Sequence, residues 1–248
     1  MFTKESLYIN AVKYDTQLKL DYKKLNNEEI IEMNNSVYLV SNDLLPLEIA
    51  QKINSSQEEI ENSFISTLLI SDTTKLVPKN LSSKLTDCEI GKFNNEFDIA
   101  VLKTTLFETK NYFAKTGIDY IYSAFHIMNL HIEKKVCRNE LLIFLYNDKA
   151  FILILDKSGI IVFHETIDLP TFEIVKKTHF YEDDLEGQKL FDEIYYLELN
   201  EIIHNTLNDF YNKKSGIFVE KITILYVLKQ LTNEDVEQLA HDLMLKVD

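Results

Sequence analysis

One stretch of the sequence, residues 140–167, constrains the fold of this chain more than any other. It reads ELLIFLYNDKAFILILDKSGIIVFHETI and holds three apolar runs rich in isoleucine, leucine, valine and phenylalanine. The runs are separated by residues 147–149 (Asn-Asp-Lys) and 156–159 (Asp-Lys-Ser-Gly), and the second suits a tight hairpin because Gly159 accepts a positive φ. Short apolar runs bounded by such turns are typical of strands. The stretch therefore predicts an antiparallel meander of three strands.

The composition indicates a globular protein, and its charge argues against nucleic acid and anionic membranes as partners. The 248 residues are 46% hydrophobic, which is enough to bury a full core in one large domain or two lobes. The formal net charge of −14 repels nucleic acid and anionic membrane surfaces. No apolar run approaches the roughly 20 residues of a membrane span, and no secretory signal is visible. The chain has two cysteines, Cys88 and Cys137, and their spacing does not exclude a disulfide between them. Two lone thiols nevertheless favour a reducing compartment, so we expect a cytoplasmic protein.

The rest of the chain alternates between strand and helix patterns. Residues 97–102, 104–116 and 118–124 read as a strand, a helix closed by Gly117, and a second strand, which predicts a βαβ unit with parallel pairing. The other expected elements are a hairpin over 6–14 and 17–25, an acidic turn over 28–33, a buried strand over 36–41, helices over 47–53 and 57–69, a polar loop with one short strand over 71–93, a short helix over 126–133, and a helix, strand and helix over 188–212, 219–227 and 232–245.

Several stretches, taken together in their order, resemble the actin-like cytoplasmic domains of the PilM and GspL group, which belong to type IV pilus and type II secretion platforms. They are FDIAVLKTTLFETKNYFAKTGIDYIYSAFHIMNL at 97–130, the meander from residue 139, LNEIIHNTLNDFY at 199–211, and the strand at 222–227 followed by a helix. The resemblance covers about residues 36–248. It implies an α/β protein with two RNase H-like lobes of an actin-like ATPase fold, a first lobe over 1–135 with inserted helices and a second over 136–248.

The sequence departs from the nucleotide-binding members of this group at the turns that hold phosphate. Those members place glycines after the first strand of each lobe and a Gly-Gly pair after the last strand. This chain has Tyr-Asp-Thr at 14–16, Asn-Asp-Lys at 147–149 and Tyr-Val-Leu at 226–228. A β-carbon at these turns hinders the approach of backbone N–H groups to phosphate. We therefore expect a degenerate nucleotide site, no cofactor and no catalytic residues.

By resemblance, the chain is expected to be a non-catalytic scaffold of an inner-membrane assembly platform. Its partners would be an assembly ATPase and a membrane-anchored platform protein, and it would sit peripherally at the inner membrane. The sequence does not choose between type II secretion, type IV pili and DNA uptake in natural transformation. It also does not decide whether the protein forms a homodimer, which surface contacts the partners, or whether the chain is a truncated form of a longer membrane protein.

Two other functions remain open at this point. One is an active actin-like ATPase or sugar-kinase-like enzyme, which saturable binding of ATP would favour. The other is an unrelated α/β binding module, such as a toxin or a phage-type adaptor, which co-purification from the native host would separate from a platform protein.

Few residues stand out as site candidates. His126 and His131 are spaced i,i+5, unlike the i,i+4 pair of a zinc helix, so we expect no metal site. Asp148 is interpreted as a turn residue, although a carboxylate there would suit Mg²⁺ in an active relative. An acidic cluster is the one candidate for docking a basic partner surface, and it consists of Glu182, Asp183, Asp184 and Glu186.

Overall fold

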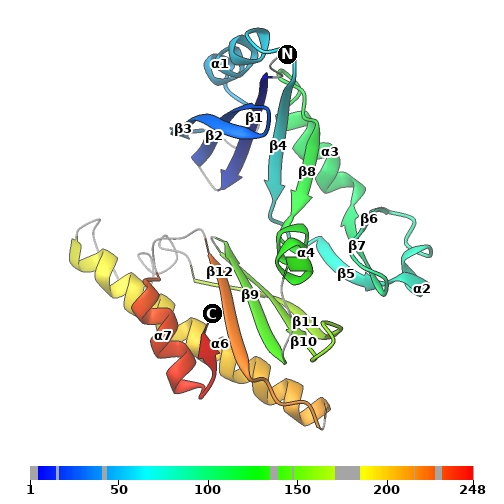
Figure 1. Cartoon of the computed structure of the whole chain (residues 1–248), viewed down its shortest axis with the longest axis vertical. Helices are drawn as coiled ribbons and strands as arrows, with labels where there is room; N and C mark the ends of the chain where they lie inside the picture. Colours follow the sequence, from blue (N-terminus) through cyan, green and yellow to red (C-terminus); the bar gives the residue numbers. More distant parts are fainter. Residues whose placement is uncertain are drawn as a thin grey trace. The chain divides into compact units, whose positions relative to one another are not determined.

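The computed structural model describes residues 5–14, 17–40, 44–134, 139–146, 148–170, 185–214, 216–226 and 231–247. The chain divides into two compact units, Met1–His126 and Ile127–Asp248. Each unit is built on a five-stranded mixed sheet, and the first unit carries an additional three-stranded sheet (Figure 1).

The main sheet of the first unit combines an antiparallel meander with parallel strands. Its order is β3-β2-β1-β4-β8, in which β1, β2 and β3 pair antiparallel and β4 and β8 extend the sheet parallel to β1. The bounds are β1 Glu5–Tyr14, β2 Gln17–Asn26, β3 Glu29–Leu39, β4 Ser63–Leu69 and β8 Tyr120–Ser123. The predicted hairpin over residues 6–25 is confirmed.

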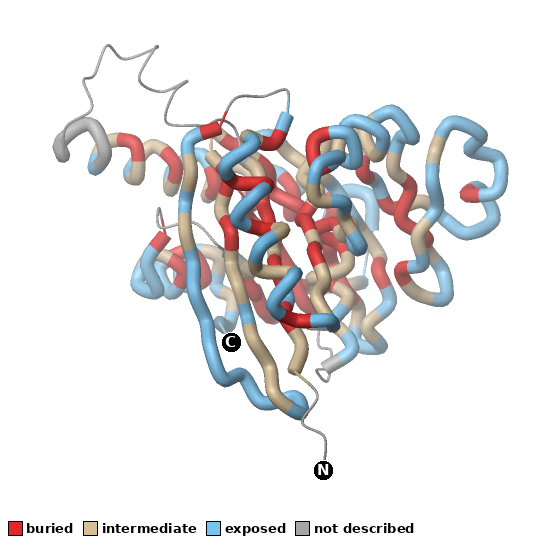
Figure 2. Tube along the Cα trace, turned by 90° about the horizontal axis from the view of Figure 1, so that it is seen from above, coloured by how far each residue is buried: buried red, intermediate tan, exposed pale blue. Residues whose placement is uncertain are grey.

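Helices α1 (Leu47–Glu58) and α3 (Lys103–Tyr112) belong to the core on one face of this sheet. Ile9 and Leu20 point to that face and are completely buried together with Ile53 of α1, and Phe113, at the end of α3, joins them. Figure 2 shows this buried layer and the exposed edge of the sheet beside it. The core of the first unit therefore lies between the sheet and these helices.

The additional sheet is inserted between β4 and α3. It has the order β5-β7-β6 and is entirely antiparallel. Its elements are β5 Thr74–Pro78, the short helix α2 Lys79–Ser82, β6 Cys88–Lys92 and β7 Phe97–Leu102. The hydroxyl of Ser82 donates to the buried carboxylate of Asp98 at 2.8 Å, which ties α2 to β7.

Three predictions for the first unit are wrong. Residues 63–69 form strand β4 rather than a helix, because pairing with β1 and burial of Ile65 outweigh the helical spacing of the apolar residues. The expected acidic turn over 28–33 is part of β3, and the turn before it uses Asn27 and Glu28 at positive φ. Residues 36–41 were expected to be buried, but Val37 is 56% and Leu39 82% exposed, because both lie on the face of the sheet opposite the α1 core.

The predicted βαβ unit is also wrong in its pairing. Strand β7 pairs antiparallel with β5 and β6, whereas β8 pairs parallel with β4, which precedes it by about fifty residues. The expected polar loop over 71–93 holds most of the inserted sheet. Helix α3 ends at Tyr112, four residues before its predicted end, and residues 113–116 form a turn. Gly117 closes this turn with a φ of +70°, and its N–H donates to the carbonyl of Phe113 at 2.8 Å.

The second unit repeats the strand order of the first. Helix α4 (Ala124–Lys134) leads into it, and its sheet has the order β11-β10-β9-β12-β13. The predicted meander is confirmed as β9 Glu140–Tyr146, β10 Lys149–Leu155 and β11 Ile161–Asp168. The remaining elements are β12 Lys221–Tyr226 and β13 Lys246–Val247, parallel to β9, and the helices α6 Leu185–Lys213 and α7 Asn233–Asp242.

Every residue of β9 and β10 is buried, so this hairpin is the centre of the core of the second unit. Side chains of α6, among them Phe191, Leu199 and Phe210, pack against it. The start of α7 carries the expected signal: the Thr232 hydroxyl accepts from the N–H of Asp235, whose carboxylate accepts from the N–H of Thr232.

Candidate functional site

The carboxyl ends of β1 and β4 in the first unit border a cavity of about 450 Å³. Lys13 and Tyr112 line it, and the Lys13 ammonium lies 5.3 Å from the centre of the Tyr112 ring. Burial raises the pKa of Tyr112 to about 12, so its hydroxyl stays neutral at physiological pH. The turn residues 15 and 16, like 147, 227 and 228, lie outside the described residues, so the phosphate turns are characterised by their sequence alone.

Asp148 directly precedes β10, and its backbone continues the pairing of β10 with β11. Its carbonyl accepts from the N–H of Leu169 at 2.7 Å. Its carboxylate lies 3.9 Å from the ammonium of Lys149, which pairs more closely with the carboxylate of Asp168. In the described part of the chain, no group of three histidine, cysteine or acidic residues is placed to hold a metal ion.

A second concavity, which we call the β6–α4 groove, lies within the first unit between the inserted sheet and the end of β8. Its volume is about 210 Å³, and its walls are mostly apolar. The residues that line it include Thr74, Ile90, Gly91, Ile99, Ile121 and His126, and Glu89 lies on its wall as well. They come from β5, β6, β7, β8 and α4, so the groove exists only when the inserted sheet is folded against the main one.

His126 supplies an oriented polar group in this apolar groove. The backbone N–H of Ser123 donates to its Nδ1 at 3.1 Å, and the Ser123 hydroxyl lies 3.0 Å from the same atom. Because Nδ1 accepts, the neutral ring carries its proton on Nε2. Nε2 lies on the side of Gly91, 3.8 Å from where a β-carbon on that glycine would stand. The groove therefore offers a directed N–H donor in mostly apolar surroundings.

Burial lowers the pKa of His126, because the charged imidazolium loses hydration in the groove. Protonation would also convert the Nδ1 acceptor into a donor that faces the N–H of Ser123. A histidine with a depressed folded pKa stabilises the fold fully above its unfolded pKa of about 6.5, and this contribution is lost as the pH falls through the folded pKa.

We expect an NMR titration of the native chain to place the His126 midpoint below about 6.5. The His126→Asn variant assigns the resonance, and its stability should depend less on pH in the acidic range than that of the wild type. A midpoint at or above the ordinary histidine value would contradict the tautomer and the buried position described above.

The groove adjoins a free strand edge. In the inserted sheet β6 is an outer strand, and no described strand pairs with its other side. Ile90 of β6 is exposed beside the groove. An extended peptide can pair its backbone with such an edge while alternate side chains enter an adjoining pocket. The Nε2–H of His126 is then placed to donate to a carbonyl or carboxylate oxygen of that peptide.

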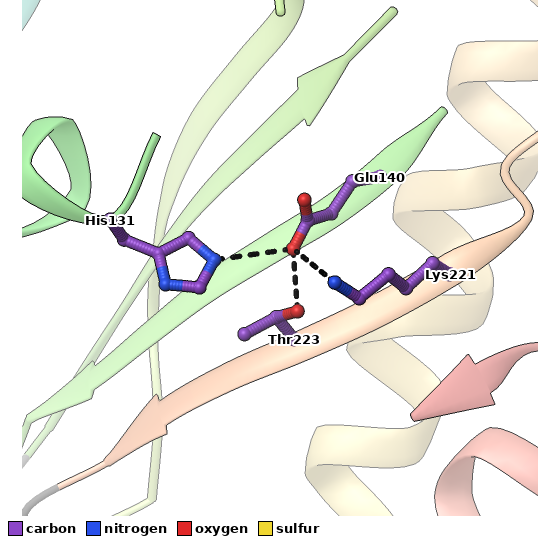
Figure 3. A network of polar contacts seen from close by, with 4 residues as sticks. All are labelled: His131, Glu140, Lys221 and Thr223. Carbon is purple, nitrogen blue, oxygen red and sulfur yellow. Dashed lines mark hydrogen bonds and ion pairs between the residues drawn. The ribbon is translucent and has the colours of Figure 1, made fainter. Parts of the chain in front are cut away.

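A buried ionic cluster stands at the amino end of β9 in the second unit (Figure 3). The carboxylate of Glu140 accepts from the Thr223 hydroxyl at 2.5 Å and lies 3.6 Å from the Lys221 ammonium and 3.4 Å from His131 Nε2. Only 2% of the Glu140 side chain and 11% of the Lys221 side chain are exposed. The cluster joins α4, β9 and β12 and has a structural part in holding these elements together.

The residues named from the sequence are not brought into one site. His126 bonds to Ser123 and His131 approaches Glu140, so the two histidines have different surroundings. Glu182, Asp183 and Asp184 of the acidic cluster lie outside the described residues, and Glu186 falls in the first turn of α6. Sequence reasoning missed Gly91 and Glu140. A glutamate that opens an otherwise apolar strand was the available signal for Glu140, and none pointed to Gly91.

No helix in the described ranges is long and apolar enough to cross a membrane.

Residues 3–129 match the model of one family, described as a domain of unknown function (DUF8569). No curated protein matches the sequence. Among solved structures, a PilM-PilN type IV pilus biogenesis complex is similar with a TM-score of 0.63 and 14% identity, over 98% of this chain and 87% of that chain.

Two further structures point to the same fold. A Bacteroides thetaiotaomicron protein with an actin-like ATPase fold and unknown function has a TM-score of 0.50 and 10% identity, over 98% and 90% of the two chains. The ethanolamine utilization protein EutJ from Carboxydothermus hydrogenoformans has a TM-score of 0.53 and 7% identity, over 98% and 84%. These similarities confirm that the chain has the actin-like ATPase fold expected from the resemblance.

Proposed function

Since the chain belongs to the DUF8569 family, a domain of unknown function, and has an actin-like fold, we propose that it is a non-catalytic protein-binding scaffold of an inner-membrane assembly platform. The observation that carries this proposal is the similarity over 98% of the chain to PilM in a complex with PilN. The machinery served would be a type IV pilus, a type II secretion system or a DNA-uptake system.

The proposed mechanism is the capture of an extended segment of a membrane-anchored partner in the β6–α4 groove. Three features of the groove support it: apolar walls, the Nε2–H of His126, and the free edge of β6. No bond is made or broken. The second partner would be an assembly ATPase, for which the acidic cluster around Glu182 is the candidate contact. Through these partners the protein would lie peripherally at the cytoplasmic side of the membrane.

The proposal is tested by affinity purification of the tagged chain from its native host after brief crosslinking. We expect enrichment of a membrane-anchored platform protein and an assembly ATPase, and the identity of the ATPase would name the machinery. A tagged chain that carries Gly91→Leu in the groove serves as the matched control. Recovery of metabolic enzymes or phage proteins in place of platform components would contradict the proposal.

We expect Mg·ATP to leave the thermal stability of the protein unchanged. The three turns that would hold phosphate contain no glycine, so the backbone cannot approach the triphosphate closely. A ligand present at one hundred times its dissociation constant would add about 2.7 kcal/mol to the stability, a shift easily seen by calorimetry. A saturable upward shift would support the alternative, an active actin-like ATPase or sugar-kinase-like enzyme.

A further inference from the structure

The outer edge of β3 has the features of an interface between two copies of this chain. It is an eleven-residue strand at the end of the main sheet of the first unit, and no described strand pairs with its other side. Most of its residues are exposed. Its exposed large apolar side chains are Ile30, Ile31, Met33, Val37 and Leu39.

This edge lacks the usual protection against pairing with another strand. Natural edge strands are kept short or carry lysine, proline or a bulge. The irregularity opposite Lys24 and Leu25 affects only the first part of β3, whereas residues 33–39 pair with β2 in unbroken register. Residues 33–39 read MNNSVYL and contain neither proline nor lysine. A regular strand edge of seven residues is therefore open to a partner.

The charge pattern along β3 fits a second copy of the same protein. The chain carries a net charge of −14, so two copies repel each other over most of their surfaces. Residues 33–39 hold no charged side chain, and the acidic residues of β3, Glu29 and Glu32, lie outside that segment. Two copies can thus approach along this segment without placing carboxylates against each other.

The alternation of side chains supports an antiparallel pairing about a two-fold axis. Val37 pairs with Lys19, one position from the core residues Leu18 and Leu20, so Val37 lies on the face opposite the α1 core. Met33 and Leu39 share that face because strand residues two apart point to the same side. With a two-fold axis through Ser36, each residue of one copy lies opposite a residue of the other copy that points to the same face of the sheet. The pairs are Met33 with Leu39, Asn34 with Tyr38, and Asn35 with Val37.

We propose that two copies of this chain associate through antiparallel pairing of β3, with the two-fold axis at Ser36, so that the two main sheets become continuous. Such an interface is isologous, because each copy offers the same segment to the other. Backbone hydrogen bonds would fix the register, and Met33, Val37 and Leu39 would each gain a side-chain neighbour across the two strands. The inference rests on the first unit alone and is independent of the proposed platform function.

The first test is the oligomeric state of the full chain, measured by sedimentation velocity from micromolar to submillimolar concentration. We expect a reversible dimer for the wild type. Val37→Lys/Leu39→Lys should weaken it at least tenfold, because lysines on an edge strand oppose pairing and the apolar contact of Leu39 with Met33 of the other copy would be lost. Phe107→Lys/Leu197→Lys, which adds the same charge at exposed sites on α3 and α6, should leave the dimer unchanged.

The second test addresses the register. In a Cys88→Ser/Cys137→Ser background, Ser36→Cys should give a disulfide-linked dimer under mild oxidation. Opposed residues of antiparallel strands have Cα atoms about 4.5–5.5 Å apart, within the range that a disulfide spans. Leu197→Cys in the same background should remain monomeric on a non-reducing gel.

Several results would overturn the inference. A monomeric wild type throughout the concentration range would remove the dimer itself. A dimer that resists Val37→Lys/Leu39→Lys, or that both lysine pairs disrupt equally, would place the contact elsewhere. A dimer in which Ser36→Cys forms no crosslink would exclude the two-fold axis at that residue.

Discussion

Replacing Lys221 with methionine is expected to destabilise the second unit by about 3–5 kcal/mol, because Glu140 would be left buried without its cation. The substitution keeps most of the aliphatic stem and removes the charge. The Thr223 hydroxyl and His131 remain near the carboxylate, but they do not replace a full positive charge. Hydrogen exchange of the amides of β9 and β12 measures this loss within the unit that carries the cluster.

The matched control is Lys157→Met. Lys157 also forms an ion pair, at 3.4 Å from Glu220, but 73% of its side chain is exposed. Exposed pairs contribute about 0–1 kcal/mol, so this variant should stay close to the wild type. The double variant Glu140→Gln/Lys221→Met should recover much of the lost stability, since neither buried charge remains. Equal effects of Lys221→Met and Lys157→Met would contradict the buried character of the cluster.

Filling the β6–α4 groove is expected to abolish capture of the membrane-anchored partner. A β-carbon on Gly91 would meet His126, and the carbonyl and side chain of Ile99, at 3.8–4.0 Å, which are ordinary contacts. The backbone at Gly91 therefore accepts a side chain, and Gly91→Leu should fold while its branched end occupies the space of the peptide. We expect recovery of the partner to fall at least tenfold, equivalent to about 1.4 kcal/mol in binding free energy.

Lys92→Leu is the control for this experiment. It introduces the same residue at the next position of β6, which does not line the groove. Thermal unfolding of both variants establishes that they are folded. Retention of the partner by a folded Gly91→Leu protein would exclude the groove as the binding site, and the platform function would then require another surface.

The elements that sequence reasoning found share a local cause. The meander β9–β11 is defined by apolar runs and by turns such as 156–159, and both signals act over a few residues. The same holds for the turn that Gly117 closes after α3 and for the capping of α7 by Thr232. The resemblance to actin-like platform proteins rested on the order of such local pieces, and the fold it implied is confirmed.

The errors concern pairing between distant segments. Residues 63–69 have apolar side chains at helical spacing, but a strand forms because β1 and β8 flank this segment and pair with it. Strand β7 belongs to an inserted sheet, so its nearness in sequence to β8 did not predict its partner. Intrinsic strand preference is weaker than the tertiary context in which a segment is placed.

The amino-acid sequence by itself determined the central meander, the start of α7, the actin-like order of elements and the absence of glycine from the phosphate turns. Only the tertiary structure decided where the β6–α4 groove lies and that the outer edge of β3 is left without a partner strand among the described residues. Thr74, Gly91 and His126 form one groove although more than fifty residues separate the first from the last. The physical reason is that turns and caps are stabilised by neighbours along the chain. Grooves and strand edges depend on contacts between segments far apart in the sequence, which form only when the chain folds.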